Sequence, residues 1–91
     1  MYRYQVPVDD QIHTIPTTSA PVHIASRTPG IVEFWAELDD EAEPWDTRYI
    51  VVGTGHAIPT GAKYVGTTEA EFGLVWHLYE TPPWARHDAG R

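Results

Sequence analysis

Short runs in which apolar and polar residues alternate recur along the chain. In residues 2–8 the apolar side chains Tyr2, Tyr4, Val6 and Val8 fall on one face, and a period of two residues is typical of a β-strand. Further strands are expected at 12–15, 22–27, 31–38, 48–54, 64–69 and 74–79. Proline or glycine separates these runs about every ten residues, as in all-β domains. The pattern predicts an all-β fold, a small antiparallel β-sandwich or barrel of about five to seven short strands with no long helix.

Prolines and glycines indicate where strands turn or end. Pro7 cannot donate a ladder hydrogen bond, so the first strand is expected to lie at a sheet edge or to end there. Pro16 is expected to end the second strand. Thr28-Pro29-Gly30 fits a type II turn, because Gly30 tolerates a positive φ. The strands on either side of this turn should form a hairpin, and 64–69 and 74–79 a second one.

The most continuous apolar runs indicate the core. Run 48–54 has apolar residues on both faces and is expected to be a central strand. In run 31–38, Phe34 shares a face with other apolar residues, whereas Glu33 and Glu37 should face outward. The residues expected to be buried are Phe34, Ile50, Val52, Leu74 and Trp76.

Length and charge limit the classes of protein that fit. With 91 residues, the chain is expected to form a single β domain over residues 1–80 and a tail over residues 81–91. Its net charge of −7 argues against direct nucleic-acid binding, which needs clustered Lys and Arg. No apolar run reaches the length of a membrane span, and the first ten residues lack the apolar stretch of a signal peptide. The chain has no cysteine, which excludes disulfides and thiolate sites.

Several stretches of the chain resemble a family of small bacteriophage and prophage proteins that has no assigned activity. The stretches are Tyr4-Gln5-Val6-Pro7, Phe34-Trp35-Ala36, Arg48 to Ile58 with its Gly53-Thr54-Gly55-His56 core, Tyr64-Val65-Gly66-Thr67 and the aromatic-rich Leu74 to Glu80. The resemblance covers about 80 residues, all but the tail. It implies a phage accessory role in the host cytoplasm and supplies no catalytic residues.

Gly53-Thr54-Gly55-His56 is a candidate loop site. It lacks the Lys-Ser/Thr of a phosphate-binding P-loop, and glycines after a strand commonly make a bulge or a tight corner. The five His residues show no metal-ligand spacing, and no serine lies in a nucleophile elbow. We therefore expect no metal, no cofactor and no enzymatic activity.

An acidic ridge is the best candidate interaction surface. Five acidic residues lie within positions 39–46, directly after the expected strand 31–38, and tryptophans interrupt the charges. Tryptophan is enriched at binding hot spots. The expected surface comprises Glu33, Trp35, Glu37, Asp39, Asp40, Glu41, Glu43 and Trp45. The alternative is a solvated rim with Trp35 and Trp45 in the core.

These features favour a non-enzymatic phage accessory protein that acts by protein–protein contact. One form would be an acidic inhibitor of a host nucleic-acid-handling or defence protein, free in the host cytoplasm. A second hypothesis is a virion component such as a capsid decoration protein. A third is a small-molecule or nucleotide-binding module that uses the loop Gly53–His56. The sequence does not indicate the oligomeric state.

Overall fold

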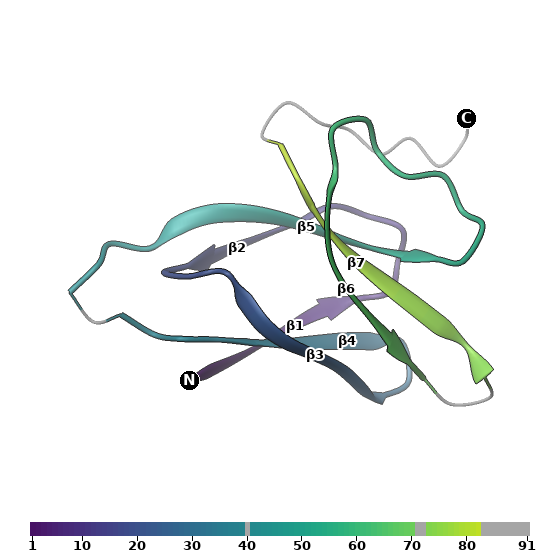
Figure 1. Cartoon of the computed structure of the whole chain (residues 1–91), viewed down its shortest axis with the longest axis horizontal. Helices are drawn as coiled ribbons and strands as arrows, with labels where there is room; N and C mark the ends of the chain where they lie inside the picture. Colours follow the sequence, from purple (N-terminus) through teal and green to yellow (C-terminus); the bar gives the residue numbers. More distant parts are fainter. Residues whose placement is uncertain (40, 71–72, 83–91) are drawn as a thin grey trace.

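A computed structural model describes residues 1–39, 41–70 and 73–82 of the chain. These residues form seven strands and no α-helix (Figure 1). The strands are β1 (Tyr2–Pro7), β2 (His13–Thr17), β3 (Pro21–Thr28), β4 (Ile31–Ala36), β5 (Trp45–Gly53), β6 (Lys63–Glu69) and β7 (Val75–Thr81). In this part of the chain there is accordingly no helix that could span a membrane.

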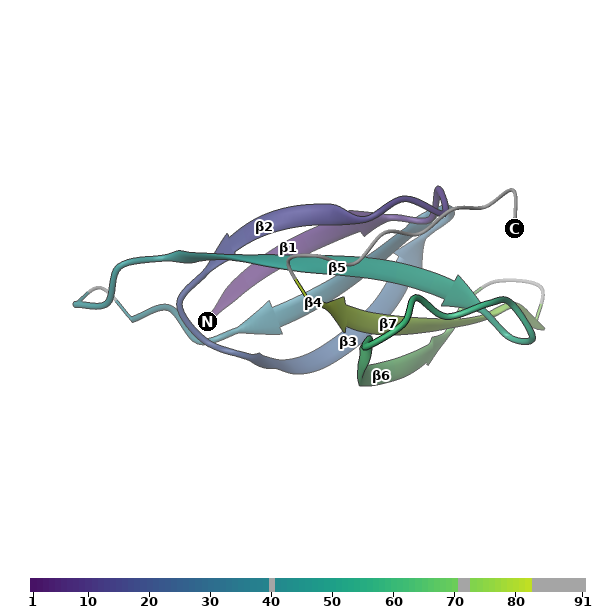
Figure 2. The same cartoon turned by 90° about the horizontal axis from the view of Figure 1, so that it is seen from above.

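The strands make two antiparallel sheets, as the alternation predicts. One sheet has the order β1-β4-β3 and the other has the order β2-β5-β7-β6. β3 contacts β6 where the sheets approach each other, and Ile24 of β3 lies against Gly66 of β6. The long strand β5 runs along the longest axis of the molecule in both views (Figures 1 and 2), so its two ends lie far apart.

The core lies between the sheets and is centred on aromatic rings. Phe34 of β4 and Tyr49 of β5 are buried, and their ring centroids are 4.8 Å apart. Of the five residues expected in the core, Phe34, Ile50 and Val52 are buried, and Trp76 is half-buried against it. The prediction for Leu74 is wrong.

Leu74 is 49 % exposed because it lies before β7 begins. Its carbonyl oxygen accepts a hydrogen bond from the Ala70 N–H across the turn from β6, at 2.8 Å. The predicted second hairpin is confirmed, but its closing residues belong to the turn.

The outer face of the four-stranded sheet is partly covered. Ile50 and Val52 alternate with Tyr49 and Val51, which face the core, and so point to the outer side. Residues 54–62 follow β5 and fold back toward this side: Pro59 is buried, and Ile58 shares a hollow with Val52. This cover explains why β5 is apolar on both faces.

All four edge strands carry an irregularity that hinders pairing with another sheet. β1 holds Pro7 and β2 holds Pro16, while β3 and β6 have register shifts. The expectation that Pro16 ends the second strand is wrong, because β2 continues to Thr17. Proline is tolerated there since β2 lies at the edge of its sheet.

The turns and strand limits follow the predictions with shifts of a few residues. Gly30 has φ +76°, and Thr28 pairs with Ile31, which confirms the Pro29-Gly30 hairpin. β4 ends at Ala36 rather than at position 38, and β5 begins earlier than expected, at Trp45. β7 continues to Thr81, and residues 83–91 of the predicted tail lie outside the described residues.

Candidate functional site

Glu33 does not belong to an exposed acidic ridge. It points away from the core, as predicted, but is only 2 % exposed. Arg27 of β3 donates to both its carboxylate oxygens, from Nε at 3.0 Å and from Nη2 at 3.2 Å. Arg3 of β1 lies 3.3 Å away on the other side. The alternation along β4 gives the correct face, but the neighbouring strands cover the side chain.

The two arginines keep Glu33 ionised. Hydrogen bonds from Arg27 lower the pKa of the Glu33 carboxyl, and burial opposes this. The positive charges of Arg27 and Arg3 lower the pKa further, so that it lies below its ordinary value of 4.5. The carboxylate lies under a single layer of half-exposed arginine side chains at the surface.

Trp35 also lies outside the acidic surface. It is half-buried on the outer face of the three-stranded sheet. The Arg27 guanidinium lies 5.3 Å from its ring centroid, and the His23 ring lies 5.2 Å away. A cation over an indole face is a favourable contact. Trp35 therefore packs with basic side chains rather than presenting its ring beside carboxylates.

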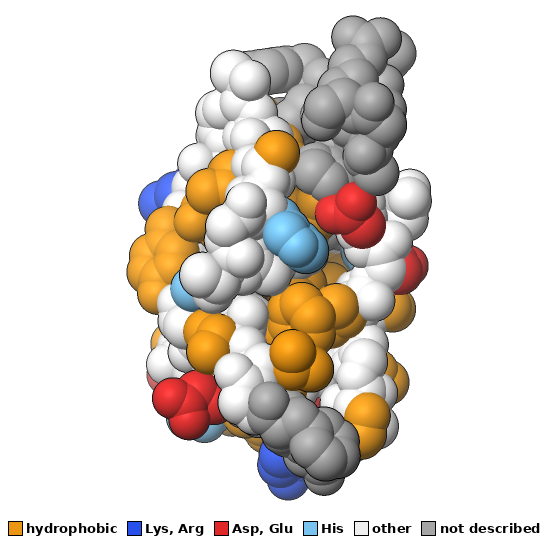
Figure 3. All heavy atoms as spheres, turned by 90° about the vertical axis from the view of Figure 1, so that its right-hand side faces the viewer, with side chains coloured by type: hydrophobic (Ala, Val, Ile, Leu, Met, Phe, Trp, Pro, Cys, Tyr) orange, Lys and Arg blue, Asp and Glu red, His pale blue; other side chains and the backbone are white. Residues whose placement is uncertain are grey.

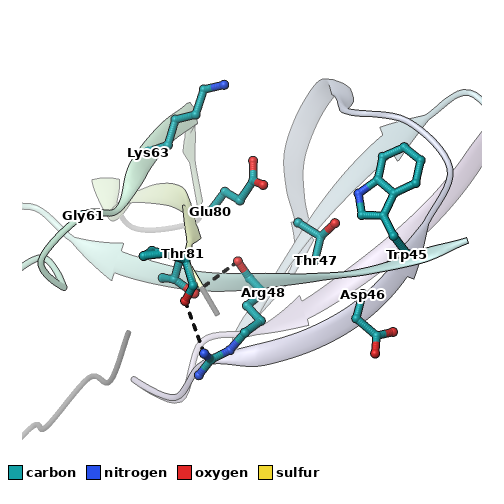
Figure 4. A pocket seen from close by; sticks show the side chains of 9 residues that line it. Trp45, Asp46, Thr47, Arg48, Gly61, Lys63, Glu80 and Thr81 are labelled. Atoms are coloured by element: carbon teal, nitrogen blue, oxygen red, sulfur yellow. Dashed lines mark hydrogen bonds between the residues drawn. The ribbon is translucent and has the colours of Figure 1, made fainter. Parts of the chain in front are cut away.

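The remaining residues of the ridge form an acidic tip, defined here as residues 37–46, of which residue 40 is not described. Its other residues are exposed except Ala42, and it lies at one end of the longest axis (Figure 1). The predicted members Glu37, Asp39, Glu41, Glu43 and Trp45 thus lie in one exposed segment. Asp46 is exposed as well, but it points to the opposite side of β5 from Trp45 (Figure 4). Asp40 lies outside the described residues.

Hydrogen bonds fix the base of the acidic tip. The hydroxyls of Thr18 and Ser19 donate to the Glu37 carbonyl at 3.2 and 2.6 Å. The Asp39 N–H donates to Thr18 Oγ1 at 3.0 Å, and the Asp39 carboxylate accepts from the Glu41 N–H at 3.0 Å. The tip is therefore anchored to the segment that joins β2 and β3.

Trp45 is an exposed apolar side chain of the tip; the sequence alone does not show whether it is exposed or in the core. It is 52 % exposed and lines a hollow of about 280 Å³ together with Arg48, Lys63 and Glu80. Figure 4 shows the indole on the same side of β5 as Lys63 and Glu80, with Arg48 on the other side. Arg48 Nη1 donates to the Pro82 carbonyl at 3.2 Å. The hollow offers a partner an aromatic wall with charged groups around it.

The loop Gly53–His56 is a β-turn at the far end of β5. The His56 N–H donates to the Gly53 carbonyl at 3.1 Å, and Gly55 has φ +85°, a conformation that glycine adopts readily. The rings of His56 and Trp76 both lie 3.2 Å from the position that a Cβ on Gly53 would take. Gly53 thus permits two rings to approach the strand end.

A chain of hydrogen bonds joins this turn to two other strands. Thr54 Oγ1 lies 2.9 Å from His77 Nε2, and Thr67 Oγ1 lies 2.9 Å from His77 Nδ1. Tyr64 Oη lies 2.6 Å from Thr67 Oγ1. We call this set of four side chains the His77 chain. The sequence pattern does not single out His77, because its partners depend on the register of β6 and β7.

Two hollows adjoin the turn and share Gly53, Thr54 and His56. The larger, about 450 Å³, is also lined by Leu74, Val75 and Trp76. The smaller, about 150 Å³, reaches His77 and also Tyr79. Figure 3 looks at this end of the molecule and shows hydrophobic side chains gathered beside histidine. The described residues contain no group of three or more His, Asp or Glu placed to hold a metal ion.

Comparison with known proteins yields a family but no characterised relative. No curated protein and no solved structure matches the chain. A family model does match, and its description names no activity. Membership of a family without an assigned function is therefore confirmed, while the phage context stays a prediction. The chain belongs to the family described as Domain of unknown function (DUF7352), whose model matches residues 1–88.

Proposed function

We propose that this protein is a non-enzymatic binding module whose acidic tip docks on a basic surface of a partner protein. The observation that carries the proposal is Trp45, a large aromatic side chain that is 52 % exposed beside a hollow. Tryptophan is among the residues that most often dominate binding energy at interfaces. Leu38, also 52 % exposed, offers a second apolar contact on the same tip.

The charges of the tip define the kind of partner. Glu37, Asp39, Glu41, Glu43 and Asp46 are exposed, and positions 37–46 contain no Lys or Arg. Such a surface attracts a basic patch at long range and accelerates encounter more than it strengthens the bound state. The apolar side chains then supply the short-range contact. A protein surface that otherwise holds nucleic acid has this basic character.

In this proposal the protein is a phage accessory factor that acts in the host cytoplasm as an inhibitor of a nucleic-acid-handling or defence protein. The acidic charge and the sequence resemblance support this context. A virion component is the alternative, and it would be present in many copies in purified particles.

Affinity capture with matched variants tests the proposal. The wild type, Trp45→Ala and Tyr64→Ala are immobilised and exposed to bacterial lysate. Tyr64 is 55 % exposed, lies on β6 outside the tip and is not among the residues that line the Trp45 hollow, so it controls for loss of any exposed aromatic ring. We expect a basic protein to be retained by the wild type and by Tyr64→Ala, and at least about tenfold less by Trp45→Ala.

Equal capture by the wild type and the Trp45 variant would exclude the tip as the interface. Capture that does not weaken when salt is raised would exclude the electrostatic part of the proposal, because added ions screen exposed charges over about 8 Å at physiological ionic strength.

A further inference from the structure

We propose that the end of the molecule at Gly53–His56 is a binding site for a small aromatic carboxylate. This inference goes beyond the proposed function, because it concerns the end of β5 opposite the acidic tip and does not depend on a protein partner. It is carried by the two hollows at the turn, by the ring of Trp76 and by the His77 chain.

The larger hollow suits a flat apolar group. It is lined by the Trp76 ring and by Leu74 and Val75. Leu74 is about half exposed although it is apolar. Binding pockets for small molecules combine such apolar walls with a few placed polar groups. At about 450 Å³, the hollow has room for a single aromatic ring with a substituent.

The polar groups belong to residues that both hollows share. Thr54 and His56 line both of them. His56 is held there because its ring packs over Gly53 beside the Trp76 ring. In the proposed complex the ligand ring lies against Trp76, and its polar substituent reaches the Thr54 hydroxyl, because Thr54 and Trp76 line the same hollow.

The His77 chain can present a free donor at Thr54. Its three hydroxyls and a neutral imidazole bring four donor protons to three hydrogen bonds. When Tyr64 donates to Thr67, Thr67 donates to Nδ1, and His77 Nε2–H donates to Thr54, the Thr54 O–H is left to donate elsewhere. An acceptor bound beside Thr54 favours this arrangement of donors and acceptors, because it receives the free Thr54 O–H.

The acceptor that gains most from such a donor is an ionised carboxylate. Hydrogen bonds to a charged acceptor are about twice as strong as those between neutral groups. Among the residues that the structure describes, no Asp or Glu lines either hollow. Glu69 pairs with Val75 in the register of β6 and β7, but it lines neither hollow.

The net negative charge of the protein repels a carboxylate ligand at this site only weakly. The acidic tip lies at the other end of a molecule about 40 Å long, whereas charges are screened over about 8 Å at physiological ionic strength. The ligand class is therefore set by local donors and by the Trp76 ring.

Titration of the full chain with benzoate tests the proposal at pH 7 by NMR. The readouts are the indole N–H of Trp76 and the ring signals of His56 and His77. We expect saturable shifts at all three, with Trp45 unchanged. Benzamide, which has the ring without the charge, and acetate, which has the charge without the ring, should each bind at least about tenfold more weakly.

Variants locate the binding site. Thr54→Val removes the donor at nearly constant shape and should weaken benzoate binding about tenfold, the worth of one hydrogen bond to a charged group. Thr67→Val acts only through His77 and should weaken it less, about twofold. Thr14→Val, an exposed threonine on β2, is the matched control and should leave binding unchanged.

Each contrary result would overturn the proposal in a defined way. Absence of shifts up to 20 mM benzoate, roughly the range of very weak ligands, would exclude the site. Equal binding of benzamide would exclude the carboxylate preference, and equal binding of acetate would exclude the role of Trp76. Wild-type affinity in the Thr54 variant would exclude Thr54 as the donor.

Discussion

The two ends of β5 differ in how their candidate residues come together. At the acidic tip the candidate residues are neighbours in the sequence, and those that the structure describes are exposed. At the Gly53 end, Thr54, Thr67 and His77 come from separate parts of the chain, and the pairing of β5, β7 and β6 brings them within hydrogen-bond distance. The first surface depends on local sequence and the second on sheet register.

This difference predicts different sensitivities to mutation. A change in strand register or sheet packing should damage the His77 chain before it alters the charge of the tip. A change of surface charge should affect the tip and leave the fold intact.

Removal of the shared core should affect both ends. Phe34 is fully buried and contacts Tyr4 and Tyr49, so Phe34→Ala should lower the free energy of unfolding by about 3–5 kcal/mol. Leu74→Ala, at an exposed position, should cost less than about 1 kcal/mol. Urea unfolding of the two variants measures the difference, and equal costs would contradict the described core.

Glu33→Gln tests whether Glu33 belongs to the fold rather than to the tip. The change removes a carboxylate that is hydrogen-bonded by Arg27 and paired with Arg3. It should cost about 1–3 kcal/mol of unfolding free energy. Glu37→Gln, which changes an exposed acid of the tip, should stay within about 0.5 kcal/mol. If the two variants lost the same free energy of unfolding, Glu33 would behave as an exposed acid and not as part of the fold.

The same residue predicts a pH dependence. Because the native pKa of Glu33 lies below its ordinary 4.5, its contribution to stability is complete above about pH 4.5 and is lost as the pH falls through the native pKa. Between pH 6 and pH 3, the free energy of unfolding should therefore fall less steeply for Glu33→Gln than for the wild type. Unfolding curves recorded at each pH measure this slope. An unchanged slope would contradict the lowered pKa.

Two matched glycine substitutions distinguish an effect on the Gly53 end from a general loss of stability. Gly55→Ala and Gly30→Ala both place a side chain at a positive φ, and each should cost about 1 kcal/mol. Only Gly55→Ala should also shift the ring signals of His77, because Gly55 follows Thr54 in the turn. Similar His77 spectra in both variants would show that the turn does not hold the His77 chain.

Charge reversal at the tip should have the smallest effect on stability. Asp39→Lys together with Glu41→Lys changes exposed side chains, so the free energy of unfolding should change by no more than about 0.5–1 kcal/mol. The melting temperature of the variant measures this change. Thr18 still accepts the backbone N–H of Asp39 in this variant. A large loss of stability would mean that the tip is part of the folded framework.

The sequence predicts local features of this fold better than it predicts contacts between strands. Alternation predicts the strands, and Pro29-Gly30 predicts the turn at Gly30, since both depend on neighbouring residues. Burial of Phe34 follows from the apolar run around it.

Its failures arise where distant strands decide the outcome. Glu33 is covered by arginines from β1 and β3, and Pro16 is tolerated because β2 lies at an edge. The same limit applies to the candidate sites. The tip is visible as a run of acids, whereas His77 joins Thr54 and Thr67 only through strand pairing.

The proposed function depends on contact between Trp45 of the acidic tip and the partner protein. The indole N–H signal of Trp45 can be followed by NMR with a soluble paramagnetic agent that weakens the signals of exposed groups. In the free protein Trp45 should be attenuated more than the half-buried Trp35 and Trp76. On addition of the captured basic protein, Trp45 should become protected while Trp76 keeps its attenuation. Continued attenuation of Trp45 in the bound state, or protection of Trp76 in its place, would contradict the account.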